Sequence, residues 1–120
     1  MFNYYIYRTY FNAKHSFNGD ITKIHGHSFT VVTYIGMKDS KEDIPFFKLE
    51  AIISSFIDQY RGRYLNELPE FEGCGNTLET IGDYFYEKLR KQLMKSGMEL
   101  YQLDISENPL CVYQLSLIHI

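Results

Sequence analysis

Several features that this 120-residue chain lacks exclude whole classes of protein. Its only two cysteines, Cys74 and Cys111, make no disulfide framework of the kind that small secreted domains use. No segment approaches the roughly 20 apolar residues of a membrane span, and the aromatic start lacks the basic region of a signal peptide. The basic residues are scattered and the net charge is −3, which does not suit nucleic-acid binding. We therefore expect a soluble, cytoplasmic protein with no nucleic-acid or membrane partner.

The chain also lacks repeats, low-complexity tracts and linkers, and its length fits a single domain over residues 1–120. What it has in excess is aromatic residues, with 11 tyrosines and 9 phenylalanines but no tryptophan. Tyrosine in such numbers suits half-exposed surfaces such as subunit interfaces. Plain strand content explains the same residues equally well, because tyrosine and phenylalanine also favour β-structure.

The first third of the chain predicts a β-hairpin. Residues 2–13 and 27–37 have strand patterns rich in β-branched and aromatic residues. Between them, Asn18-Gly19-Asp20 has the residue types of a tight turn. The two strands should therefore pair in antiparallel fashion.

Two helices and two further strands are expected after the hairpin. Apolar residues recur at helical spacing over Pro45–Gly62 and over Asn76–Gly97, where Asn76 is the expected N-cap. A loop joins these helices, and residues 98–106 and 111–118 have strand patterns. Strands grouped apart from helices indicate an α+β fold: a four-stranded antiparallel sheet with two helices on one face, in the order ββααββ.

Three of the four histidines are spaced so that they could meet. His25 and His27 flank one glycine at the start of the second strand, and residues i and i+2 of a strand share a face. His15 lies before the hairpin turn, so strand pairing brings it close to the other two. Three neutral imidazoles with an open fourth position are typical of a catalytic zinc site. The alternative is a surface strand that happens to carry histidines, and His119 is expected to be such a surface residue.

Five short motifs follow one another along almost the whole chain: "FNAKHSF", "HGHSF", "YLN", "NTLET" and "SENPLCVY". Together they resemble the 6-pyruvoyl-tetrahydropterin synthase and 6-carboxy-tetrahydropterin synthase family. The resemblance implies the tunnelling fold (T-fold), in which three subunits join their sheets into a barrel and two trimers commonly stack into a hexamer. It also implies that His15, His25 and His27 bind Zn²⁺, at a site that lies between subunits.

A pterin-like small-molecule substrate is a further implication of the resemblance. The family holds the pterin ring with a glutamate before the last strand, and Glu107 matches that residue. A carboxylate can accept two parallel hydrogen bonds from such a ring. Thr77 matches a family stretch at the second helix and is a second substrate-binding candidate. The alternatives are a solvated turn residue for Glu107 and a helix cap for Thr77.

The proton-transfer residues of the family are absent from this chain. The usual catalytic cysteine falls at Ile21, and the usual Asp-His pair falls at Arg61 and Gly62, which cannot act as acids or bases near pH 7. Cys111 matches a position in the last strand and is expected to be buried by packing. Each missing acid or base typically costs about 10²–10⁴ in rate, so the standard reaction is not expected at an ordinary rate.

Three interpretations of function remain open. The first is a zinc-dependent lyase or aldolase of altered specificity, in which Asp20 is the catalytic acid or base, unless Asp20 is an ordinary turn residue. The second is a non-catalytic module that binds zinc and a pterin, or a partner of an active paralogue. The third is a different substrate with a phosphate or carboxylate, bound by Arg61 and Arg63. These arginines also suit a helix C-terminus, whose dipole favours positive charge.

Overall fold

The computed structural model describes residues 3–16, 25–39, 43–71 and 77–117, and His25 through its backbone alone. Several sequence-based expectations lie outside the described residues: the Asn18-Gly19-Asp20 turn, the role of Asp20, Ile21 and the surface position of His119.

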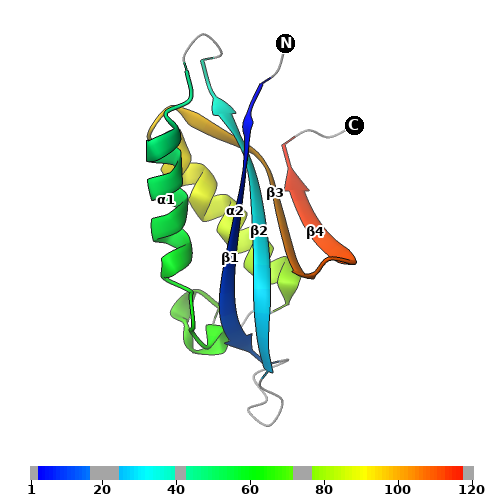
Figure 1. Ribbon diagram of the computed structural model, residues 1–120. Helices are drawn as coiled ribbons and strands as arrows, with labels where there is room; N and C mark the ends of the chain where they lie inside the picture. The colour runs from blue at the N-terminus through cyan, green and yellow to red at the C-terminus, as the bar shows by residue number, and fades with distance from the viewer. Residues whose placement is uncertain (1–2, 17–24, 40–42, 72–76, 118–120) are drawn as a thin grey trace.

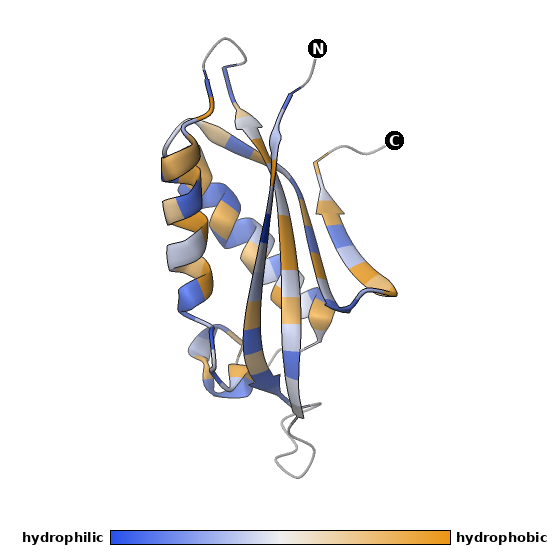
Figure 2. Cartoon of the chain, viewed as in Figure 1, coloured by the Kyte–Doolittle hydropathy of each residue, from blue (hydrophilic) through white to orange (hydrophobic). Residues whose placement is uncertain are grey.

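Four strands form one antiparallel sheet with the order β1-β2-β3-β4 (Figure 1). Their bounds are Tyr5–His15 for β1, His25–Met37 for β2, Met98–Asn108 for β3 and Cys111–Ser116 for β4. Along β1, buried residues alternate with exposed ones from Phe11 to His15, which is the period of two that a half-buried strand requires. Figure 2 shows the same alternation of apolar and polar residues along the strands. The predicted hairpin, the antiparallel sheet and the order ββααββ are confirmed.

Both helices pack on one face of the sheet, which we call the covered face (Figure 1). Helix α1 spans Phe46–Asp58 and helix α2 spans Leu78–Met94. Each buries a stripe of aliphatic and aromatic side chains at helical spacing, against the inward residues of the strands. The members of these stripes are Leu49, Ile53, Phe56 and Ile57 in α1, and Ile81, Phe85, Leu89 and Leu93 in α2. None of the described helices is long and apolar enough to cross a membrane.

The helix ends differ in detail from the predicted ones. Helix α1 ends at Asp58, and Gly62 takes a positive φ of 75° in the turn that follows, a conformation that glycine adopts without strain. The stretch expected to be a loop contains two short 3₁₀ helices, η3 over Leu65–Glu67 and η4 over Pro69–Phe71. Leu65 and Phe71 are both buried, so these turns fasten the connection to the core.

Two sequence-based expectations are corrected. The N-cap of α2 is Thr77 and not Asn76: the Thr77 hydroxyl accepts a hydrogen bond from the backbone N–H of Thr80 at 3.1 Å. Asparagine and threonine both cap helices well, so residue type alone could not choose between neighbours. Cys111 is exposed rather than buried, because it begins an edge strand whose first two residues are both exposed.

Candidate metal centre

The β1–β2 register brings the histidine-bearing ends of two strands together. His15 lies opposite His25, and Ala13 lies opposite His27. The imidazole rings of His15 and His27 meet edge to face with centroids 5.1 Å apart. The predicted approach of His15 to the second strand is therefore confirmed for His27, while the His25 side chain lies outside the described residues.

Glu107 is the third described residue at this point. Strand β3 pairs with β2, and the register places Thr30 opposite Ser106, which brings Glu107 to the end of the sheet where the histidines lie. Glu107 Oε1 is 3.4 Å from His15 Nε2, and Glu107 Oε2 is 3.5 Å from His27 Nε2. One donor atom from each of the three residues lies within 4.8 Å of the other two.

The site is buried on the side of His15 and Phe29 and partly exposed on the side of His27 and Glu107. His15 is buried, with 7% of its surface exposed, while the side chains of His27 and Glu107 keep 32% and 23% of theirs. Phe29 is fully buried and contacts both rings, with centroids 5.7 Å from His15 and 6.2 Å from His27. An apolar floor of this kind fixes the imidazole planes and keeps water away from one side of the site.

This donor set fits a zinc ion. Two imidazole nitrogens and a carboxylate oxygen are ligands that zinc takes in catalytic sites. A metal there would gain a buried ligand in His15 and an accessible side towards His27 and Glu107. Sequence reasoning brought the histidines together but assigned Glu107 to a ring contact and not to this cluster.

Asn66 holds the end of β1 that carries His15. Its side-chain Oδ1 accepts the backbone N–H of Ser16 at 2.9 Å, and its Nδ2 donates to the Ser16 carbonyl at 3.1 Å. The hydroxyls of Ser16 and Tyr64 lie 2.7 Å apart. Sequence reasoning noted Leu65-Asn66 only as part of a motif. No local pattern in the sequence signals this role, because the contact joins residues that are 50 positions apart.

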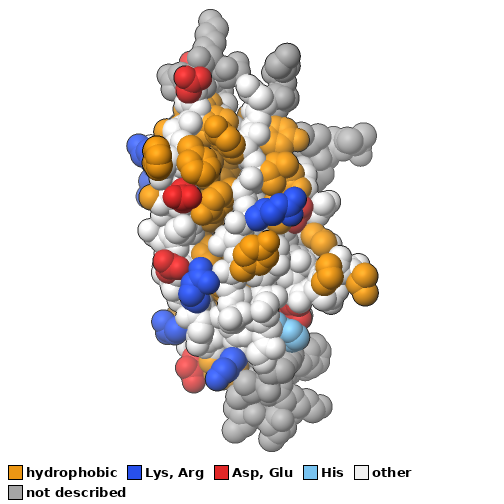
Figure 3. Space-filling view, in the orientation of Figure 1, with side chains coloured by type: hydrophobic (Ala, Val, Ile, Leu, Met, Phe, Trp, Pro, Cys, Tyr) orange, Lys and Arg blue, Asp and Glu red, His pale blue; other side chains and the backbone are white. Residues whose placement is uncertain are grey.

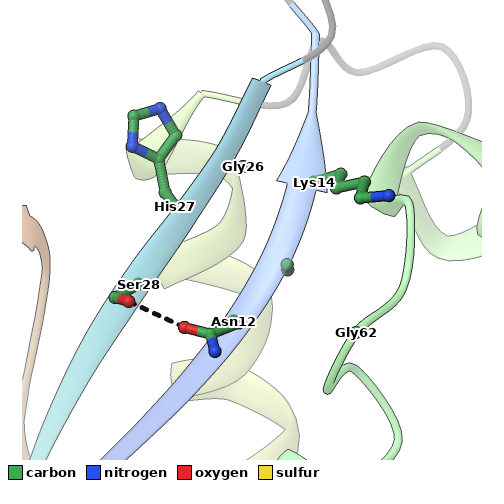
Figure 4. A pocket seen from close by; sticks show the side chains of 7 residues that line it. Asn12, Lys14, Gly26, His27, Ser28 and Gly62 are labelled. Atoms are coloured by element: carbon green, nitrogen blue, oxygen red, sulfur yellow. Dashed lines mark hydrogen bonds between the residues drawn. The ribbon is translucent and has the colours of Figure 1, made fainter.

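A pocket of about 320 Å³ lies beside His27 (Figure 4). Asn12, Lys14, His27 and Ser28 line it, and the Ser28 hydroxyl donates to Asn12 Oδ1 at 2.7 Å. Figure 4 shows the His27 and Lys14 side chains pointing to opposite sides. The volume lies at the lower end of the range for small-molecule pockets.

The positions of the family's Asp-His pair have a structural role in this chain. The Arg61 guanidinium contacts Asp58 at 3.2 Å and donates to the Tyr10 carbonyl at 2.8 Å. The backbone N–H of Gly62 donates to the Asn12 carbonyl at 2.6 Å. Both residues therefore fasten the segment after α1 to the edge of β1.

Thr77 uses its hydroxyl in the cap of α2, where it also lies 3.0 Å from the Thr80 hydroxyl. This accounts for its residue type without a ligand. Its role as a substrate contact stays a prediction.

The comparisons with known proteins give one family. The family model described as 6-pyruvoyl tetrahydropterin synthase matches residues 5–116. The solved structure of the Caenorhabditis elegans 6-pyruvoyl tetrahydropterin synthase superposes with a TM-score of 0.79 at 21% identity, covering 95% of this chain and 94% of the other. The Plasmodium falciparum 6-pyruvoyl tetrahydropterin synthase gives 0.66 at 16% identity, with 94% and 96% covered.

A third structure is a Plasmodium vivax 6-pyruvoyltetrahydropterin synthase in which a catalytic glutamate is replaced by alanine. It gives a TM-score of 0.60 at 16% identity, with 92% of this chain and 97% of the other covered. A search of curated proteins by sequence gives no significant match. The structural similarities establish the fold, and the family model covers nearly the whole chain.

Proposed function

Because the chain belongs to the 6-pyruvoyl tetrahydropterin synthase family, we propose that it is a zinc protein that acts on a dihydropterin-type molecule as a lyase or aldolase of altered specificity. The observation that carries the proposal is the convergence of His15, His27 and Glu107 at one end of the sheet. In this proposal the reaction takes place beside that cluster.

The proposed zinc ligands are His15, His25 and His27. Zinc bound there would polarise a hydroxyl or carbonyl of the pterin side chain. The chain itself supplies the orientation of His15, through the Asn66 contacts to the next residue, and the dry floor of Phe29. Neutral imidazoles in a fixed tautomer are what such a site requires.

Asp20 is the proposed acid or base. The Plasmodium vivax relative has a glutamate as a catalytic residue, which supports a carboxylate in this role. The predictions that Glu107 accepts the ring hydrogen bonds and that Thr77 contacts the substrate stay predictions. A cytoplasmic location stays a prediction as well.

We also propose a homo-oligomer, a trimer or a hexamer, that closes the sheet edges. Strands β1 and β4 lie at the two edges of the sheet, and an exposed edge strand readily pairs with another chain. The segment after α1 covers the β1 edge from Tyr10 to Lys14, through hydrogen bonds to Tyr10, Asn12 and Lys14. Figure 3 shows apolar side chains gathered over the upper part of the viewed face. The exposed large apolar residues include Tyr4, Tyr5, Ile6, Tyr10, Phe46 and Phe47.

A specific observation favours a second candidate, a module that binds zinc and a pterin without turnover. Arg61 and Gly62 stand where the family has its proton-transfer pair, and both are engaged with the edge of β1. In a mixed oligomer with an active paralogue, this chain would need to supply only the residues that bind zinc and the pterin, and not the proton-transfer residues.

The test is to incubate zinc-loaded protein with dihydroneopterin triphosphate and with dihydroneopterin, and to separate the products by chromatography. The lyase or aldolase proposal expects turnover of at least one of them, lost in His27→Ala and reduced about 10²-fold or more in Asp20→Asn. Glu87→Gln, an exposed carboxylate change on α2, is the matched control and should leave turnover unchanged.

Two results would decide between the candidates. Pterin binding without product, abolished in His27→Ala, would establish the binding module and refute the enzyme. Neither binding nor turnover of either pterin would refute both candidates.

A further inference from the structure

The Glu107 carboxylate lies between the two described histidines in a way that a ring-holding role does not explain. Each of its oxygens faces a different imidazole, at 3.4 Å from His15 Nε2 and 3.5 Å from His27 Nε2. To accept two parallel hydrogen bonds from a ring, both oxygens must face the ring on one side. Here both face the histidine pair.

The two distances match ligands that share a metal better than direct hydrogen bonds. A charge-assisted hydrogen bond between an imidazole and a carboxylate would measure about 2.7–2.9 Å. In a tetrahedral zinc site with bonds of about 2.1 Å, neighbouring donor atoms lie about 3.4 Å apart. Each Glu107 oxygen therefore lies at such a separation from one imidazole nitrogen, and one donor atom of each of the three residues lies within 4.8 Å of the other two.

We propose that Glu107 is itself a metal ligand in the resting protein, in the coordination position that an open catalytic site leaves to water or substrate. This inference rests on the proposed zinc centre and goes beyond it. In the proposed centre of His15, His25 and His27, one Glu107 oxygen would be the fourth ligand and would close a tetrahedral site. A substrate that coordinates the metal must then displace Glu107.

The placement of Glu107 suits a ligand that can leave. It is the penultimate residue of β3, next to the β3–β4 hairpin, and its side chain is 23% exposed. His15, in contrast, is buried and its strand end is held by Asn66. The cluster therefore combines a fixed ligand with one that has room to move towards solvent.

The experiment measures metal binding and not turnover. Wild type, Glu107→Gln, Glu107→His and the exposed-carboxylate control Glu87→Gln are stripped of metal, and their zinc affinities are measured by competition with a chromophoric chelator. Visible absorption of the Co²⁺-loaded proteins then reports coordination number, because tetrahedral Co²⁺ absorbs more strongly than five- or six-coordinate Co²⁺. Melting curves of the metal-free proteins check that each variant is folded.

We expect Glu107→Gln to weaken zinc binding about tenfold or more and to change the Co²⁺ spectrum, because an amide is a far poorer ligand than a carboxylate. Glu107→His should restore tight binding with a spectrum of its own, since imidazole has a similar reach. Glu87→Gln should match wild type. If Glu107→Gln does not fold, Glu107→His carries the test alone, through its altered spectrum.

Wild-type affinity together with an unchanged Co²⁺ spectrum in the Glu107 variants would overturn the inference while leaving the three-histidine centre intact. Absence of metal binding by the wild type would overturn the inference and the proposed zinc centre together. The two failures are therefore distinguishable.

Discussion

At the scale of single residues, Asn66 has a structural role that the "YLN" motif did not predict. It satisfies both the N–H and the carbonyl of Ser16, the residue that follows His15. Because His15 is buried at the end of a strand, its position depends on where that end is held. Asn66 is therefore a positioning residue for the candidate metal centre.

Asn66→Ala is expected to lower zinc affinity about 10-fold or more, the range seen when an outer residue of a metal site is removed. Tyr64→Phe, which removes only the hydroxyl beside Ser16, should have a smaller effect. Chelator competition gives both affinities, and the melting curve of the metal-free protein separates loss of positioning from loss of fold. Equal affinities in wild type and Asn66→Ala would refute the positioning role.

Residue-scale prediction from sequence had a clear limit. The period of two along a strand was enough to place His15 near His27, because hairpin contacts are local. The Asn66–Ser16 contact spans 50 residues, and Glu107 reaches the histidines from β3. Such contacts depend on how α1 and β3 return to the hairpin, which no local pattern encodes.

At the scale of elements, helix α2 lies very close to the sheet at Gly82. A Cβ built on Gly82 would come within 2.9 Å of Ile105 Cγ2 and within 2.9 Å of the Tyr113 ring. Ile105 is fully buried, so it has little room to move. The absence of a side chain at Gly82 therefore allows α2 to pack this close to the sheet.

Gly82→Ala should destabilise the protein even though alanine is the better helix former. Overpacking typically costs about 1–3 kcal/mol, against about 1 kcal/mol gained in helix propensity. We expect a net loss of about 1 kcal/mol in the free energy of unfolding, measured with urea. Glu87→Ala on the exposed side of α2 is the control and should change stability by less than about 0.5 kcal/mol. A stabilised Gly82→Ala would contradict the close packing.

A hydrogen bond between Tyr113 of β4 and Asp83 of α2 also links the helix to the sheet, and it makes the free energy of unfolding vary with pH in the alkaline range. The Tyr113 hydroxyl donates to Asp83 Oδ1 at 2.7 Å, and this hydrogen bond, with burial second, raises the pKa of Tyr113 from 10.0 to about 12. The folded state thus keeps a proton that the unfolded chain has released. Stability from this group is full below pH 10 and is lost as the pH rises from about 10 to 12.

Tyr113→Phe should reduce this alkaline loss, because phenylalanine has no proton to release. The measurement is the free energy of unfolding between pH 8 and about 12, with Asp83→Asn as a variant that keeps the phenol but removes the charge. Burial also raises the pKa of Tyr34 and Tyr86, so part of the loss should persist in both variants. An unchanged slope in Tyr113→Phe would contradict the assignment.

At the scale of elements, the hydrophobic periodicity of the sequence predicted more of the structure than it did at the scale of single residues. The stripes of α1 and α2 were visible because helical periodicity records which face is buried. Helix boundaries were less certain: α1 stops at Asp58, four residues before Gly62. The end depends on where the chain turns to meet β1, through the Gly62 contact to Asn12.

At the scale of the whole molecule, the fold and its edges were predictable together. Alternating strands and two amphipathic helices allow one layer of helices on one sheet, which the structure confirms. The same arrangement leaves β1 and β4 at the edges. Assembly through those edges is a proposal that follows from the architecture and not from any single residue.

A charge on the edge strand should disrupt that assembly. Ile6 on β1 is 48% exposed, and lysine is a common guard against edge pairing. Ile6→Lys is expected to shift the protein, in gel filtration with light scattering, from three or six chains towards one chain of 14.2 kDa. Glu87→Lys on α2 should leave the assembly intact. A monomeric wild type would contradict the proposed oligomer.

The central claim is that this chain is a zinc protein, and its metal content tests that claim most directly. Protein purified without chelators from zinc-containing medium is analysed by inductively coupled plasma mass spectrometry, alongside His27→Ala. We predict about one zinc ion per chain in the wild type and a large loss in the variant. Wild-type protein without zinc, or His27→Ala with undiminished zinc, would contradict the account.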